Sequence, residues 1–297
     1  MTDATNRPIA GGLVASITQR LRDTGVGCEI VNFVPTETGV LRRDRIVVVL
    51  ALTLLTALAW SYLLWLSADI SMDGMIPSGM ALMVPAHTPW QPMEFAFVFV
   101  MWTVMMVGVM TPSAAPMFLM YARMGRLTDA QGTPLPATVW FAAGYFLVWV
   151  AFALLATWVQ WGLERSGLLD SWMASTSSVL AAFVFVVAGS YQWTRLKDVC
   201  LTQCQRPFAF LMRHGVFRPD ASGSVMLGLR HGAYCVGCCW ALTALLLVGG
   251  VMNLLWIGLL ALLILLEKVT PFGRRIAPLA GTIPLVAGAW LLSMAIS

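Results

Sequence analysis

Long apolar runs separated by short polar connections make up most of the chain after residue 45. Most of these runs reach the roughly 20 residues that an α-helix needs to cross a bilayer, and none alternates as a membrane β-strand does. We therefore expect an all-α, polytopic transmembrane bundle of about seven spans, or six if the short sixth run does not cross. The expected spans are residues 46–66, 94–121, 137–161, 175–193, 231–250, 254–266 and 276–296.

The basic residues set the expected orientation. Of the 18 Lys and Arg residues, all but Arg165 fall on one side of the membrane in this threading. Because Lys and Arg accumulate in cytoplasmic loops, we expect the N-terminus inside and a multi-pass location in the cell inner membrane. Residues 1–45 then form a cytoplasmic extension. The transmembrane domain, 46–297, has an outer Met-rich loop at 67–93 and an inner basic, cysteine-containing loop at 195–230.

Composition supports a membrane protein. The chain is 59% hydrophobic and 11% charged, with a mean hydropathy of +0.80. A soluble domain of this composition would expose large apolar patches, so the lipid bilayer is the expected partner. Residues 1–40 are mixed and polar, and no cleavable signal peptide is predicted. The net charge of +4 reflects topology, and no nucleic-acid partner is expected.

One face of the fifth predicted span carries an imidazole and three thiols within an arc of about 100°. The connection before it adds two thiols four residues apart, which share a helical face. In a reducing cytosol these cysteines stay reduced and suit a soft transition metal. The alternative is that they only pack as small buried residues. The candidate ligands on this side are Cys200, Cys204, His231, Cys235, Cys238 and Cys239.

Soft ligands also gather on the predicted outer side. The outer loop contains Met72, Met75 and His87, and thioethers with an imidazole suit Cu(I). Glu94 begins the next span, where an acidic group could meet an arriving cation, and Met105 continues a methionine stripe along it. The alternative is that these methionines pack against neighbouring helices.

Glu267 and Lys268 end the sixth predicted span. Ionisable groups beside a span are costly, so they face the bundle interior or mark its rim. The pair either marks the inner interface, or Glu267 is a carboxylate that orients His231 or stabilises a bound cation.

Several stretches are together typical of one family. They are Met101–Met106, Met110–Met117, Gly144-Tyr145, Ala188–Gln192, Lys197, Cys200–Cys204, His231–Trp240 and Glu267-Lys268. Over roughly residues 95–275 the chain resembles a bacterial family of predicted metal-binding integral membrane proteins, the domain of unknown function 2182. The resemblance implies metal binding and names neither a reaction nor the ligands. Where that family usually has Ala-Met-Met, this chain has Gly108-Val109-Met110, which removes position 109 as a ligand.

Two soft-ligand clusters joined by a Met-striped helix favour copper handling, as uptake, delivery or homeostasis. Zinc also fits three thiols and an imidazole, and the Met-rich outer side favours copper. A soluble metallochaperone or partner subunit is the expected protein partner. The alternative function is a copper-dependent membrane oxidoreductase, or a membrane subunit of one, that works with a soluble partner. A third reading is an interaction scaffold in which the cysteines only pack.

Overall fold

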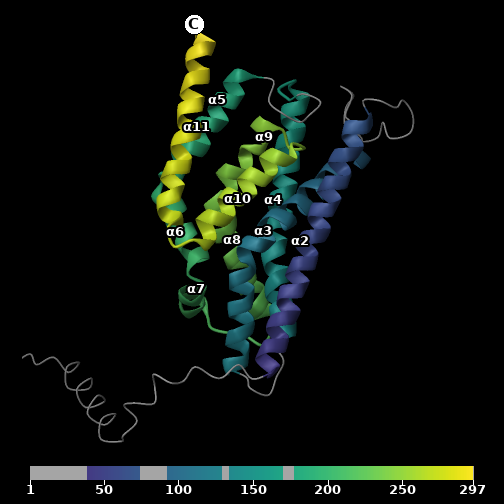
Figure 1. The fold of residues 1–297 in the computed structure, drawn as a ribbon, viewed down its shortest axis with the longest axis vertical. Coiled ribbons are helices and arrows are strands. Elements are labelled where there is room, and N and C mark those ends of the chain that lie inside the picture. The colour runs from purple at the N-terminus through teal and green to yellow at the C-terminus, as the bar shows by residue number, and fades with distance from the viewer. Residues whose placement is uncertain (1–38, 74–91, 129–133, 170–176, 297) are drawn as a thin grey trace, which may run out of the picture. The chain divides into compact units, whose positions relative to one another are not determined.

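The computed structural model describes residues 39–73, 92–128, 134–169 and 177–296, and all the elements in these ranges are helices (Figure 1). The helices are α2 Gly39–Asp73, α3 Pro92–Thr128, α4 Leu135–Arg165, α5 Ser178–Gln192, α6 Arg195–Gln205, α7 Pro207–His214, α8 Ala221–Ala244, α9 Leu246–Gly249, α10 Leu254–Val269 and α11 Gly273–Ile296.

Five segments are long and apolar enough to cross a membrane, and α5 with α6, bent by 63°, would make a sixth. The five are Arg43–Ala68, Pro92–Leu127, Leu135–Arg165, Ala221–Gly249 and Gly273–Ala295. The chain is therefore a multi-pass helical membrane protein, which confirms the predicted fold class. At 16 residues, α10 is about 24 Å long and shorter than a hydrocarbon core of about 30 Å. This short helix explains why the count falls below seven.

The cysteine-bearing helix begins earlier than the apolar run predicted. α8 starts at Ala221, where the Asp220 side chain accepts a hydrogen bond from the backbone N–H of Gly223 at 2.6 Å and caps the helix. His231 and its cysteines therefore lie within a long helix and not at the start of one. The segment before α8, predicted as a loop, is largely helical, since α6 and α7 occupy it.

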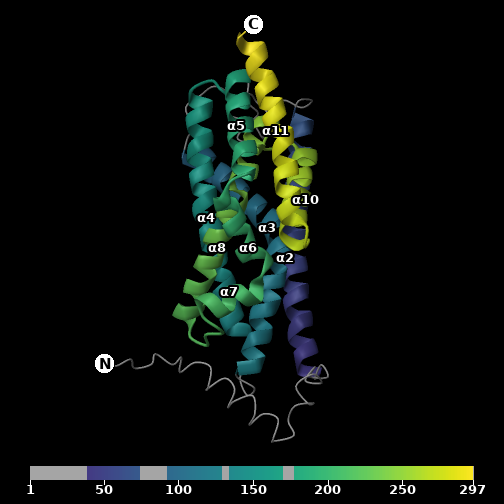
Figure 2. The ribbon, with the colours of Figure 1, turned by 90° about the vertical axis from the view of Figure 1, so that its left-hand side faces the viewer.

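Glycines let α8 lie directly against α4. A Cβ on Gly228 would lie 2.0 Å from the carbonyl oxygen of Phe141, and one on Gly144 would lie 2.2 Å from that of Val225. Such contacts between backbones are typical of helices packed in a bilayer. α5 and α11, which run side by side in Figure 2, meet in the same way at Gly189 and Gly281.

Buried polar contacts join the remaining helices. Arg126 of α3 pairs with Asp44 of α2 at 2.5 Å, and the indole N–H of Trp102 donates to Gln160 of α4 at 2.7 Å. Because polar groups are costly in hydrocarbon, these contacts fix how α2, α3 and α4 face one another.

Candidate metal centre

α8 supplies three buried thiols. Cys235, Cys238 and Cys239 are each only 1% exposed. The Cys238 and Cys239 thiols lie 3.1 Å and 2.9 Å from the Cys235 carbonyl oxygen, to which they can donate. The helix itself therefore holds the Cys238 and Cys239 thiols against the backbone of Cys235.

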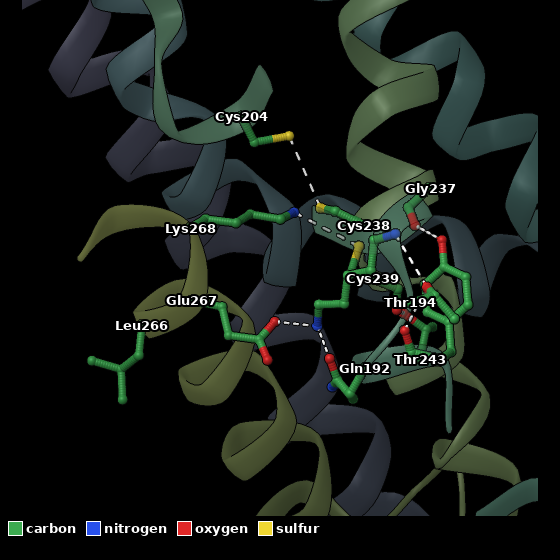
Figure 3. A network of polar contacts seen from close by, with 12 residues as sticks. Gln192, Thr194, Cys204, Gly237, Cys238, Cys239, Thr243, Leu266, Glu267 and Lys268 are labelled. Carbon is green, nitrogen blue, oxygen red and sulfur yellow. Dashed lines mark hydrogen bonds and ion pairs between the residues drawn. The ribbon is translucent and has the colours of Figure 1, made fainter. Parts of the chain in front are cut away.

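α6 brings a fourth thiol to the same place. The Cys204 Sγ lies 3.9 Å from the Cys238 Sγ, and Figure 3 shows the two side chains pointing toward each other. Cys204 is half-buried, whereas Cys238 is buried. The predicted approach of the two cysteine-bearing segments is thus present for this pair.

Cys200 lies farther along the contact between α6 and α8. A Cβ added to Gly237 would lie 2.8 Å from the Cys200 Sγ, so this glycine lets α6 come close to α8. The Tyr191 hydroxyl donates to the Gly237 carbonyl and holds the end of α5 there as well. Cys200 packs here beside the group of sulfurs.

Met110 of α3 contributes a thioether. Its Sδ lies 3.9 Å from the Cys239 Sγ, and Met110 is fully buried. We call Cys204, Cys235, Cys238, Cys239 and Met110 the sulfur cluster. Three helices contribute to it, and thiols with a thioether are the donor set that soft ions such as Cu(I) prefer.

A lysine enters the sulfur cluster from α10. The Lys268 Nζ lies 3.0 Å from the Cys235 Sγ, 3.7 Å from the Cys239 Sγ and 3.6 Å from the Met110 Sδ. Its fourth neighbour is the Ser113 hydroxyl at 3.4 Å. Lys268 is 4% exposed, so its ammonium is a buried positive charge among sulfur atoms (Figure 3).

The adjacent residue, Glu267, belongs to a different contact. Its carboxylate accepts a hydrogen bond from Lys197 of α6 at 2.6 Å, and the Lys197 ammonium also donates to the Gln192 side chain. All three side chains are buried. Glu267 therefore pairs with Lys197 and not with Lys268, and both Glu267 and Lys268 face the interior of the bundle.

His231 lies one turn before Cys235, in an aromatic box. Its ring centroid is 5.7 Å from that of Tyr145, 6.1 Å from Phe141 and 5.2 Å from Phe210. The buried Nδ1 has no hydrogen-bond partner in the described part of the chain. Tyr145 connects the box to the cluster, because its hydroxyl is 3.1 Å from the Cys235 Sγ.

The predicted outer ligands have mixed outcomes. Met75 and His87 lie outside the described residues. Met72 lies in α2, where the structure describes its backbone only. Glu94 lies in the first turn of α3, and Met105 is buried in the helical core. Their roles as ligands stay predictions.

Sequence reasoning left out two members of this arrangement. Met110 was named only as part of the stretches that resemble a known family, and its register relative to Cys239 depends on how α3 and α8 cross. A signal for Lys268 was available, since a lysine at the end of an apolar helix is rare unless it faces the interior.

Within the described ranges, no three His, Cys, Asp or Glu side chains form a closed metal site. The thiol pair of Cys204 and Cys238 nevertheless fits Cu(I), which binds in low-coordinate sulfur sites. With metal–sulfur bonds of about 2.3 Å, one ion can bridge two sulfurs up to about 4.6 Å apart. The donor set is thus suited to a soft monovalent ion.

The chain is thus a multi-pass helical membrane protein whose free thiols are the type of donor that soft metal ions prefer. The model of the PpoB2 family, described as copper chaperone, matches residues 99–291. The chain belongs to this family, and copper handling is its function. No curated protein and no solved structure matches the chain.

Proposed function

We propose that the protein holds Cu(I) at the sulfur cluster and passes it on through Cys204. The observation that carries this proposal is the pair of sulfur atoms, 3.9 Å apart, that α6 and α8 bring together. Cys204 is half-buried as a residue, and Cys238 is buried. In this proposal a partner reaches the Cys204 side of the pair, and the ion moves between this side and thiols that lipid and protein shield.

The sulfur ligands favour copper over zinc at this place. Structural zinc sites hold four ligands in a tetrahedron. His231, the predicted fourth ligand beside the α8 cysteines, instead stacks on aromatic rings. Thiols and a thioether remain, and such a set suits Cu(I). We assign Cys200 a packing role beside Gly237.

We further propose that the matched copper chaperone family and the predicted metal-binding family that the chain resembles are the same, since the two ranges overlap.

We place the protein in the cell inner membrane with the cluster toward the cytosol, where a soluble metallochaperone would exchange copper with Cys204. The outer residues Met72, Met75 and His87 would collect copper, and Glu94 and Met105 would guide it inward.

Copper content tests the inner site. The purified wild type is loaded with Cu(I), and its bound copper is compared with that of the Cys235/Cys238/Cys239→Ser triple variant and of Cys204→Ser. We expect the triple variant to lose its copper and Cys204→Ser to bind it less tightly. Cys200→Ser is the matched control and should load like the wild type. Equal copper content in the wild type and the triple variant would dismiss the inner site.

The outer loop has a separate test. Replacing Met72, Met75 and His87 together should slow copper loading of cells expressing the protein, while the purified variant still binds as much copper as the wild type. A variant that loads at the normal rate would remove these residues from the path.

A further inference from the structure

Lys268 differs from the other buried lysine in how its charge is balanced. Lys197 has the Glu267 carboxylate at 2.6 Å. The hydrogen-bond partners of Lys268, in the ranges described, are sulfur atoms and the Ser113 hydroxyl, with no carboxylate among them. An isolated buried ammonium is strongly disfavoured in hydrocarbon, so a charged Lys268 calls for an opposing negative charge among the sulfur atoms that it contacts.

The charges of a copper–sulfur complex match this need. Cu(I) bound by two thiolates carries a net charge of −1, and the Lys268 ammonium brings the sum to zero. Loading places Cu(I) between two thiolates, and any thiol proton lost on binding passes to solvent.

A divalent ion bound by the same two thiolates gives a different net charge. Between the thiolates of Cys204 and Cys238 it would form a neutral complex and leave the Lys268 charge without a counter-charge. It would reach the same sum only with a third thiolate from the cluster, which costs one more deprotonation, and it also prefers more ligands than this pair provides. Lys268 contacts Cys235 and Cys239, which belong to the same cluster as this pair. A fixed positive charge inside the cluster therefore favours an ion that needs two thiolates over one that needs three.

We propose that Lys268 is the fixed counter-charge of the sulfur cluster and that it makes the site selective for monovalent copper. This inference rests on the proposed function, because it assumes that the cluster holds the ion. Lys268 acts through the thiols it contacts and is not itself a ligand, so it is a positioning and selectivity residue.

Two substitutions separate the charge of Lys268 from its hydrogen bonds. Lys268→Gln keeps N–H donors and removes the charge, whereas Lys268→Arg keeps both. Affinities for Cu(I) and Zn(II) are measured on each purified full-length protein by competition with a chelator for each ion, and a melting curve checks folding. The ratio of the two affinities is the readout, since damage to the fold alone would weaken both.

We expect Lys268→Gln to bind Cu(I) roughly tenfold or more weakly, because a charge at contact distance in a protein is worth at least that factor. Its Zn(II) affinity should stay the same or rise. Lys268→Arg should keep the wild-type preference. If both ions weaken equally in Lys268→Gln, Lys268 only supports the fold, and if Cu(I) binds more tightly, its ammonium competes with the ion. Either result overturns the inference.

The same measurements distinguish a failure of the inference from a failure of the proposed function. If the Cys235/Cys238/Cys239→Ser variant binds Cu(I) as the wild type does, the sulfur cluster is not the site and both proposals fall. If that variant loses copper and Lys268→Gln keeps the wild-type ratio, the site stands and only the role of Lys268 is wrong. If Lys268→Gln does not fold, Lys268→Leu, which removes the charge within an apolar side chain, replaces it in the comparison.

Discussion

At the scale of single residues, the molecule buries one lysine on α6 and one on α10 and balances their charges differently. Lys197 and Glu267 form a buried ion pair at 2.6 Å, with Gln192 as a further acceptor. A buried pair adds little net stability compared with apolar side chains of the same size, but losing one partner is expensive. The pair therefore fixes α6 against α10, and so helps to place Cys204 and Lys268.

The ion pair gives a double-mutant prediction. Lys197→Leu leaves the Glu267 carboxylate buried without its cation and should lower the free energy of unfolding by roughly 3–5 kcal/mol. Lys197→Leu/Glu267→Leu removes both charges and should recover most of that loss. Unfolding of the purified protein in mixed micelles, followed by circular dichroism, measures both. Losses that simply add in the double variant would show that the two charges do not depend on each other.

At the scale of elements, α8 determines the site, because one continuous helix carries its cap, its contact with α4 and its three thiols. The capping carboxylate of Asp220 accepts the Gly223 N–H, and this hydrogen bond lowers the pKa of Asp220 below its ordinary value of 3.8 by favouring the charged form. Because the pKa is lower in the folded protein, the contribution of Asp220 to stability is fully present above 3.8. It is lost as the pH falls through the folded-state pKa.

The cap predicts a pH-dependent difference in stability. Asp220→Ala should melt at a lower temperature than the wild type at pH 7, and the gap should narrow as the pH falls below 3.8. Asp220→Asn keeps a capping side chain, so it should melt close to the wild type at pH 7. Melting curves of the three proteins between pH 7 and pH 3 test this, and a gap in Asp220→Ala that is constant with pH would contradict it.

The glycine contact between α4 and α8 predicts a strong steric effect. Gly228→Ala puts a methyl group 2.0 Å from the Phe141 carbonyl oxygen, so the two helices must separate. We expect a loss of about 1–3 kcal/mol in stability, as for overpacked cores. Gly162→Ala on α4 is the matched control, since nothing lies within 4 Å of its added methyl group. It should be neutral, or stabilising by up to about 1 kcal/mol because alanine favours helix. Chemical unfolding of both variants and the wild type measures the two changes in stability.

The apolar runs predicted most of the helices because each run is as long as a bilayer is thick. Helical periodicity alone placed Cys235, Cys238 and Cys239 on one face. The remaining site depends on contacts between distant segments: Met110 and Lys268 are 158 positions apart in the chain. The place of His231 was set by Phe141 of α4 and Phe210 of α7, and no local pattern shows that these rings would surround it.

At the scale of the whole membrane domain, the charged ends of the helices indicate its orientation. The Arg43 end of α2 and the end of α3 lie together, since Arg126 contacts Asp44 at 2.5 Å. The C-terminal end of α11 lies at the opposite end of the bundle in Figures 1 and 2. Arg218 and Ser224, at the start of α8, lie beside Tyr121 of α3, so these basic segments share the Arg43 end.

This arrangement predicts the side of the membrane on which each end of the bundle lies. Basic residues are retained on the cytoplasmic side, so the Arg43 end should face the cytosol and the C-terminus should face outward. Alkaline phosphatase fused after residue 297 should be active, and green fluorescent protein at the same position should stay dark. The same reporters fused after residue 128 should give the reverse result and serve as the control. A fluorescent C-terminal fusion would place both ends on one side, and Cys204 would then have to exchange copper in a different compartment from the one proposed.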